Sequence, residues 1–349
     1  LTNSQIGGRR NIIINGAMQV AQRSTSETGL GAATGYFTLD RFKTFFNTAG
    51  RLTMTQTADG PSGFANCLKL DCTTADTSIA ATENFILSHA IEAQDLQQLK
   101  KGTSDAEKFT LSFYVKGNAS ATYSVEIYDG DNDRQIGQTF SVTTDWTRVI
   151  LTFPADTTGA LADDNGIGFY VNWWLHSGTN YNSGTFSTSW TAQTTNQRAG
   201  NTTSFFDSTD RTFFLTGVQL EVGEQATPFE HRSFGEELAL CQRYFHSTTF
   251  ANGKAASAGG LVNSSTIGVI SGMAHPVIMR ASPTASINDV THMGVRQRAA
   301  VTTCTNVTIS TSQRACTMEL TVSSGLTVGD GCFARSVNNS CTLSFDAEL

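Results

Sequence analysis

Apolar and polar residues alternate with a period of two through the middle of the chain. Leu111, Phe113 and Val115 are separated by Ser112 and Tyr114. Because successive side chains of a strand point to opposite faces, the three apolar residues share one face of a predicted strand. The same kind of alternation predicts further strands over residues 36–42, 123–127, 140–142, 149–153 and 213–222.

One further segment, residues 167–174, is apolar on both faces, as expected of a central strand. Turn-rich sequence separates the predicted strands. Several short strands joined by turns are typical of a β-sandwich or jelly roll. We therefore predict an all-β fold, with a jelly-roll β-sandwich over residues 36–232.

The segment before the sandwich, residues 1–35, is predicted to hold an N-terminal strand and an attachment region. Three β-branched isoleucines at residues 12–14 indicate the strand. Residues 24–35 are rich in Ser, Thr, Gly and Ala and indicate a loop. Since the chain starts at Leu1 rather than at a methionine, we expect further residues upstream.

A helical connector is predicted over residues 233–246. Ser233 and Glu236 have the spacing of a capping box. An apolar stripe with helical spacing follows, and we expect its three members to be buried: Leu238, Cys241 and Phe245. A shorter helix is predicted over residues 94–101, where Gly102 would end it.

The last part of the chain, residues 247–349, is rich in Ala, Ser and Thr and predicts a second, smaller β-domain. Cys316, Met318, Leu320 and Val322 alternate clearly with polar residues there. The whole chain has seven cysteines, an odd number, without a closely spaced pair. We expect most of them to be thiols packed as small apolar groups, and we expect no zinc site.

Composition excludes several classes of protein. Charged residues make up 15% of the chain, against about 25% in an ordinary soluble protein. The net charge of −7 disfavours a nucleic-acid-binding protein, which needs basic residues to neutralise phosphates. No apolar run is long enough for a transmembrane helix, so membrane insertion is not expected. The first residues also lack the pattern of a secretory signal.

No motif for catalysis or for cofactor binding is present. The chain contains neither a nucleophile elbow, nor a metalloprotease helix motif, nor a P-loop. The adjacent carboxylates Asp163–Asp164 and Glu236–Glu237 are neighbours in sequence, which would point them to opposite faces of a strand. We therefore expect no enzyme and no cofactor, although paired carboxylates far apart in sequence stay open.

The sequence around Asp129, Asp131 and Asp133 has the spacing that opens a calcium-binding loop. That loop needs a glycine where Arg134 stands and a glutamate where Phe140 stands. A turn between two strands is therefore the favoured interpretation, and no metal site is predicted. Calcium elsewhere in the sandwich stays open.

Aromatic residues near a long loop are the candidates for carbohydrate binding. Residues 176–204 lack alternation, and a loop of this length often has a function. Flat rings cover the apolar faces of sugars, so we select three candidate carbohydrate-binding residues: Trp174, Tyr181 and Trp190. Trp173 and Trp174 are adjacent on a strand, so one of the two is expected in the core instead.

Seven stretches of sequence coincide with phrases of a known group of proteins: residues 10–23 (RNIIINGAMQVAQR), 39–42 (LDRF), 111–116 (LSFYVK), 216–223 (TGVQLEVG), 227–232 (TPFEHR), 237–245 (ELALCQRYF) and 279–284 (MRASPT). They resemble bacteriophage virion proteins, especially the tail-fibre and fibre-like appendage proteins of marine phages. Residues 108–222, with Trp146 opening a strand, are also similar to carbohydrate-binding jelly rolls attached to glycoside-degrading enzymes.

The resemblance implies a structural virion protein on the particle surface, assembled in the host cytoplasm. It would contact other virion proteins, recognise a host-surface glycan and form a homotrimer, with a monomer as the alternative. Two other functions stay open. One is a carbohydrate-binding module that targets a catalytic partner, and the other is a polysaccharide depolymerase.

Overall fold

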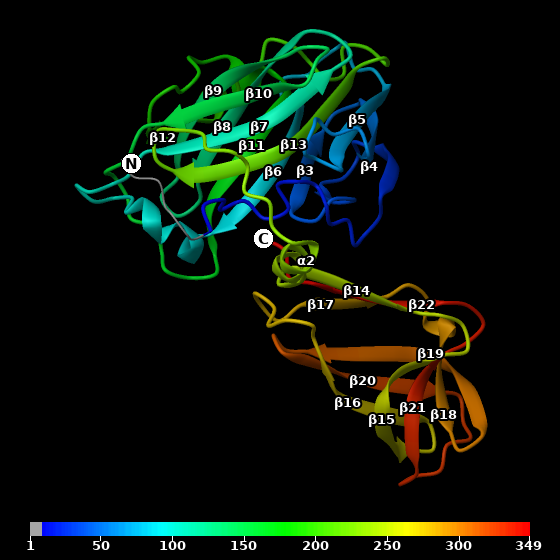
Figure 1. Cartoon of the computed structure of the whole chain (residues 1–349). Coiled ribbons are helices and arrows are strands. Elements are labelled where there is room, and N and C mark those ends of the chain that lie inside the picture. Colours follow the sequence, from blue (N-terminus) through cyan, green and yellow to red (C-terminus); the bar gives the residue numbers. More distant parts are fainter. Residues whose placement is uncertain (1–8) are drawn as a thin grey trace. The chain divides into compact units, whose positions relative to one another are not determined.

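The computed structural model describes residues 9–349, apart from the side chains of residues 257 and 258. The start of the expected attachment segment, residues 1–8, lies outside the described residues. The chain divides into two compact units, Leu1–Glu237 together with Leu349, and Leu238–Glu348. Strands dominate both units, which confirms the all-β prediction (Figure 1). Among the described helices, none combines the length and the apolar character needed to cross a membrane.

The first unit is a sandwich of two antiparallel sheets. One sheet has six strands in the order β1 (Ser26–Leu30), β4 (Arg51–Thr57), β5 (Cys67–Thr74), β13 (Thr212–Val222), β7 (Phe109–Gly117) and β10 (Thr147–Phe153). The other has seven, in the order β12 (Thr191–Ala192), β9 (Arg134–Val142), β8 (Ala121–Asp129), β11 (Ile167–Ser177), β6 (Asn84–Glu92), β3 (Phe42–Asn47) and β2 (Gly35–Tyr36).

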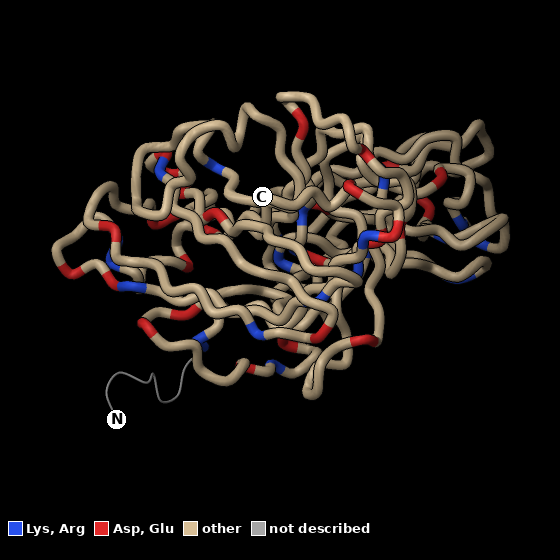
Figure 2. Tube along the Cα trace, turned by 90° about the horizontal axis from the view of Figure 1, so that it is seen from above, with Lys and Arg blue, Asp and Glu red and all other residues tan. Residues whose placement is uncertain are grey.

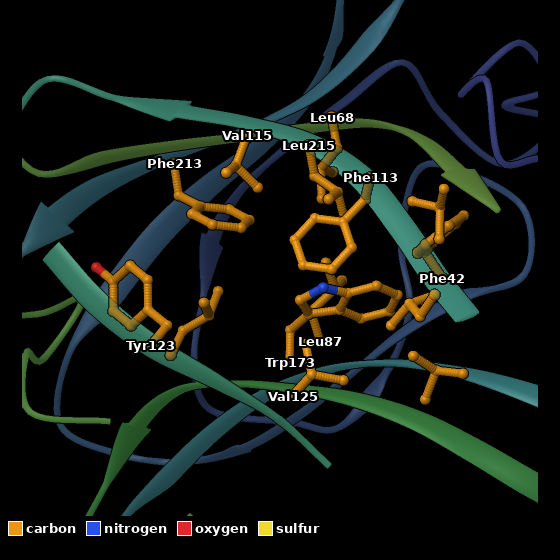
Figure 3. Packing of buried hydrophobic residues seen from close by; sticks show 14 of the residues in the cluster. Phe42, Leu68, Leu87, Phe113, Val115, Tyr123, Val125, Trp173, Phe213 and Leu215 are labelled. Carbon is orange, nitrogen blue, oxygen red and sulfur yellow. The ribbon is translucent and has the colours of Figure 1, made fainter. Parts of the chain in front are cut away.

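The predicted alternation places the core between these sheets. Leu111, Phe113 and Val115 of β7 are all fully buried. Trp173 of β11 lies opposite them, with its ring centroid 5.7 Å from that of Phe113 and 6.3 Å from that of Phe42 (Figure 3). Large aromatic side chains therefore fill the space between the sheets, and they contribute much of the buried apolar area.

The N-terminal predictions were wrong in secondary structure. Residues 12–14 form no strand. Instead, Ile13 is buried in the sandwich core, and Asn11 and Ile12 hydrogen-bond to the backbone of β13. Conversely, Ser26–Leu30, inside the predicted loop, forms the edge strand β1 paired with β4. Four of its five residues are exposed, so the strand has no alternation that the sequence could reveal.

Both predicted helices are present, but with different bounds, and the first of them is a 3₁₀-helix. The first is a 3₁₀-helix, η1 (Ala93–Leu99), and the second is α2 (Phe234–Gln242). At the start of α2, the Ser233 hydroxyl accepts a hydrogen bond from the Glu236 amide at 3.3 Å. The Glu236 carboxylate does not complete the capping box, because it pairs with Arg9 at 2.6 Å. Cys241 is buried as expected, whereas Leu238 is only half-buried.

The second unit contains a closed barrel and a small sheet. The barrel follows the order β15 (Ala255–Ser264), β16 (Ile267–Ala274), β20 (Ala315–Val322), β19 (Ala300–Thr311), β18 (Met293–Gln297) and β21 (Gly331–Ser336). The three-stranded sheet is β14 (Phe245–Phe250), β22 (Cys341–Asp346) and β17 (Thr284–Ile287), and a short 3₁₀-helix, η3 (Val290–His292), precedes β18.

All seven cysteines are buried, as their small apolar character suggested. Four of them belong to the core of the second unit: Cys304, Cys316, Cys332 and Cys341. Burial raises the pKa of Cys341 to about 11 and that of Cys304 to about 12. These groups are therefore protonated thiols that fill space, rather than reactive thiolates.

Candidate functional site

A groove on the outer face of the seven-stranded sheet is the strongest candidate site. Along β11, the residues between the core positions point away from the core: Tyr170, Asn172 and Trp174. Strand pairing sets Tyr170 beside Tyr128 of β8 and Trp174 beside Ile86 of β6. We call this site the aromatic groove, a cavity of about 290 Å³ lined by Phe45, Asn84, Ile86, Tyr128, Tyr170, Asn172, Trp174, Tyr181 and Arg198.

A buried carboxylate organises the floor of the aromatic groove. Glu126 of β8 is 1% exposed, yet its two oxygens accept four hydrogen bonds. Arg198 donates two of them, at 2.7 and 2.9 Å, and Asn172 and the Trp174 indole donate the others, each at 3.0 Å. A buried charge is tolerated when it is paired and fully hydrogen-bonded, so this network holds the floor in one arrangement.

Arg198 comes from the long loop and lies between two aromatic rings. Its guanidinium carbon is 5.2 Å from the ring centroid of Tyr128 and 5.3 Å from that of Trp174. Burial by itself would lower the pKa of Arg198, but the Glu126 carboxylate outweighs burial and raises that pKa above its ordinary value. The guanidinium is therefore permanently charged, and its two hydrogen bonds to Glu126 hold it beside these rings.

Half-exposed tyrosine rings form the open part of the aromatic groove. Tyr128 and Tyr170 stack with their centroids 5.9 Å apart and their planes 29° from parallel. Tyr181, from the short helix α1 (Thr179–Asn182), covers Trp174 at 5.1 Å. Asn84 donates a hydrogen bond to the Tyr181 hydroxyl at 3.1 Å and holds the ring in place. The groove thus offers flat apolar rings beside amide and guanidinium donors.

The three aromatic residues selected from the sequence do not share one site. Trp174 and Tyr181 both line the aromatic groove, although Trp174 is fully buried and forms its floor. Trp190 lies elsewhere, packed against Phe169 of the sandwich core at 6.0 Å. Its indole nitrogen donates to the Pro154 carbonyl at 2.8 Å, so this residue has a structural role there.

Several groove residues were missed by the sequence analysis. Tyr170 and Asn172 alternate with Trp174 on one strand, so the period of two could have identified them. Tyr128 lies on the neighbouring strand, at the position that pairs with Tyr170. Arg198 had no signal of this kind, because a loop residue reaches Glu126 only through the tertiary fold.

The aspartate-rich turn joins β8 and β9 in a hairpin, and a buried lysine pairs with the first of its aspartates. The Lys101 Nζ atom lies 2.6 Å from an oxygen of Asp129 and 3.2 Å from one of Asp156. It also donates to the carbonyls of Thr158 and Gly159, both at 2.8 Å. Two carboxylates and two carbonyls therefore surround an ammonium group, and Asp129, the first of the three aspartates, is already paired with a cation.

Charges of both signs are interspersed along the described chain, as Figure 2 shows. This distribution agrees with the low charge content and the net charge of −7.

Comparisons with known proteins give only remote likenesses. The chain matches no family model and no curated protein. Among solved structures, a CBM4 module is 14% identical, with a TM-score of 0.30 over 60% of this chain and 98% of that one. The family 11 carbohydrate-binding module from Clostridium thermocellum, in complex with a β-1,3-1,4-mixed-linked tetrasaccharide, is 7% identical, with a TM-score of 0.30 over 60% and 99%. A CBM61 module in complex with β-1,4-galactotriose is 10% identical, with a TM-score of 0.30 over 61% and 99%.

At these identities and TM-scores, the function of this chain has to be inferred from the residues of the aromatic groove themselves.

Proposed function

We propose that the aromatic groove binds a glycan. The observation that carries this proposal is the stacked pair Tyr128 and Tyr170, half-exposed beside Arg198 and above a rigid hydrogen-bonded floor. Sugar rings present apolar C–H faces that lie flat on aromatic rings, and their hydroxyls take hydrogen bonds from amide and guanidinium groups. Both kinds of group are in place before a ligand arrives, which lowers the ordering cost of binding.

The electrostatics of the groove favour an uncharged glycan. The Arg198 charge is already compensated by Glu126, so the pair presents little net charge to a ligand. The cavity of about 290 Å³ lies near the lower end of ordinary small-molecule sites, which span about 300–1,000 Å³. A short stretch of a polysaccharide chain would fill it, while the rest of the polysaccharide would extend beyond the groove.

The wider role that we propose is a non-enzymatic, fibre-like appendage of a bacteriophage particle, which recognises host-surface glycans. The seven stretches that resemble phage virion proteins support this role, and so do the β-rich architecture and the low charge. Such a protein would contact other virion proteins and would form a homotrimer. Antibody labelling of purified particles in electron microscopy tests the location, and absence of label from the particles would overturn it.

Glycan-array screening of the purified chain, followed by calorimetry with the best ligand, tests the groove. We expect Tyr128→Ala and Tyr170→Ala each to weaken binding about tenfold or more, by analogy with nucleic-acid bases, whose stacking on one aromatic side chain contributes about 1–3 kcal/mol. Tyr114→Ala is the matched control, because Tyr114 lies on β7 of the other sheet.

Unchanged affinity of both groove variants would refute the site. Release of reducing ends from the bound polysaccharide would refute the non-enzymatic role and favour a depolymerase.

A further inference from the structure

A second cluster of polar side chains lies apart from the aromatic groove, at one end of the strands of the sandwich. Asp76 follows β5, Glu83 precedes β6, and His176 lies near the end of β11. One ligand atom from each of these residues lies within 4.8 Å of the others. Strand pairing creates the cluster, because His176 lies opposite Phe85, two residues after Glu83.

His176 is the informative member of this cluster. Its side chain is fully buried, and its Nδ1 atom lies 2.8 Å from the Ser204 hydroxyl. Its Nε2 atom has no hydrogen-bond partner and lies 3.9 Å from a carboxylate oxygen of Glu83. When Nδ1–H donates to Ser204, the lone pair of Nε2 faces two carboxylates. In that tautomer Nε2 is a buried acceptor without a donor, and a cation between it and the two carboxylates would give all three groups a partner.

Hydrogen bonds from groups outside the cluster hold the carboxylates of Asp76 and Glu83 in place. The Asp76 side chain, 6% exposed, accepts hydrogen bonds from the Thr48 hydroxyl at 2.9 Å and from the Ala49 amide at 3.1 Å. Glu83 accepts one from the Ala80 amide at 2.7 Å. Among the described residues, neither carboxylate forms an ion pair with a lysine or an arginine. These bonds resemble the outer-shell contacts that orient metal ligands, and they leave lone pairs that can face an ion.

We propose that Asp76, Glu83 and His176 bind a divalent transition-metal ion, with zinc as the best match. An imidazole nitrogen beside two carboxylates suits zinc, whereas calcium and magnesium prefer oxygen ligands alone. Ligand atoms that share one zinc ion lie roughly 3–4 Å apart, because each bond is about 2 Å long. The distance of 3.9 Å between His176 and Glu83 is within that range.

The ion would join three segments of the sandwich that are distant in sequence. The side chain of Glu83 is 12% exposed, which provides a route from solvent. With three protein ligands, a water molecule would complete a tetrahedral shell. The ion would stabilise the folded chain, because the unfolded chain does not hold the three ligands together.

The test uses the full chain after treatment with EDTA and dialysis. Calorimetric titration with zinc chloride should show about one ion per chain, and zinc should raise the melting temperature. Cobalt chloride should give the visible absorption of a nitrogen- and oxygen-bound ion. We expect His176→Gln and Glu83→Gln each to weaken zinc binding at least tenfold and to abolish the thermal shift. Circular dichroism establishes that both variants fold.

His292→Gln is the control for adventitious binding, since His292 lies 3.7 Å from Asp289 at a partly exposed position outside the cluster. It should leave zinc binding unchanged. The proposal is overturned if the chain binds no zinc at micromolar concentration, or if zinc binding survives in both cluster variants. Loss of binding in the His292 variant, or a cluster that binds calcium but not zinc, would also overturn it.

Discussion

At the scale of single residues, His246 of the second unit shows how burial changes the chemistry of a side chain. It is 4% exposed, its ring stacks on Phe345 at 4.7 Å, and its Nε2 lies 3.0 Å from the Nδ1 of His275. Burial, followed by the nearby His275, lowers the pKa of His246 from 6.5 to about 4. Burial also lowers the pKa of His275.

This shift predicts that acid destabilises the second unit. The unfolded chain takes up a proton near pH 6.5, whereas the folded chain does so only near pH 4. The contribution of His246 is therefore complete above about pH 6.5 and is lost as the pH falls towards 4. Denaturant unfolding at a series of pH values should show a loss on the order of 1–3 kcal/mol that His246→Phe does not show. Parallel pH curves for the two proteins would contradict this explanation.

At the scale of elements, Lys101 connects η1, the β8–β9 hairpin and the segment after β10. Its side chain is 3% exposed, and those of Asp129 and Asp156 are 0% and 4% exposed. Arg134 of the hairpin adds a second ion pair to Asp156 at 2.7 Å. The elements are thus joined by a buried network in which each charge has a partner.

Replacing this lysine should therefore destabilise the sandwich strongly. Lys101→Met leaves Asp129 buried without its cation, and breaking a buried pair in this way costs about 3–5 kcal/mol. Lys108→Met is the matched control, since Lys108 and its partner Glu224 are both more than half exposed, and a change below about 1 kcal/mol is expected. Chemical denaturation measures both variants. Equal effects of the two substitutions would show that the Lys101 network contributes no special stability.

At the scale of the whole molecule, the proposed homotrimer needs a surface for contact between chains. Ile13 of the apolar run at residues 12–14 is not available for such a contact, because it is fully buried within its own unit. The barrel unit instead exposes large apolar side chains, with Leu261 61%, Val301 39% and Val328 64% exposed. A contact between copies that covered these side chains would remove their apolar area from water.

Light scattering should give about three times the chain mass of 37.4 kDa. Leu261→Lys combined with Val328→Lys should shift the assembly towards monomers, because a charge cannot be buried at an apolar contact without a partner. Ile150→Lys, at a residue of the first unit that is 52% exposed, is the control and should leave the mass unchanged. A mass near that of one chain for the unaltered protein would refute the trimer.

The sequence by itself determined the fold class and the faces of the long strands. The pleat of a strand sends alternate residues to opposite sides, so local alternation was enough to predict β7, β8, β10 and β13, while a run that is apolar on both faces predicted the central strand β11. It also implied that Trp173 and Trp174 face opposite ways, and the structure places Trp173 in the core and Trp174 under the aromatic groove.

The tertiary structure alone decided which residues meet. Arg198 reaches Glu126, Lys101 reaches Asp129, and His176 reaches Glu83 through strand order and loop paths that no local pattern encodes. For the same reason β1 was missed, and Trp190 could not be separated from Trp174 and Tyr181, whose groove it does not line. Strand pairing and side-chain contacts depend on long-range packing, whereas alternation depends only on the geometry of neighbouring residues.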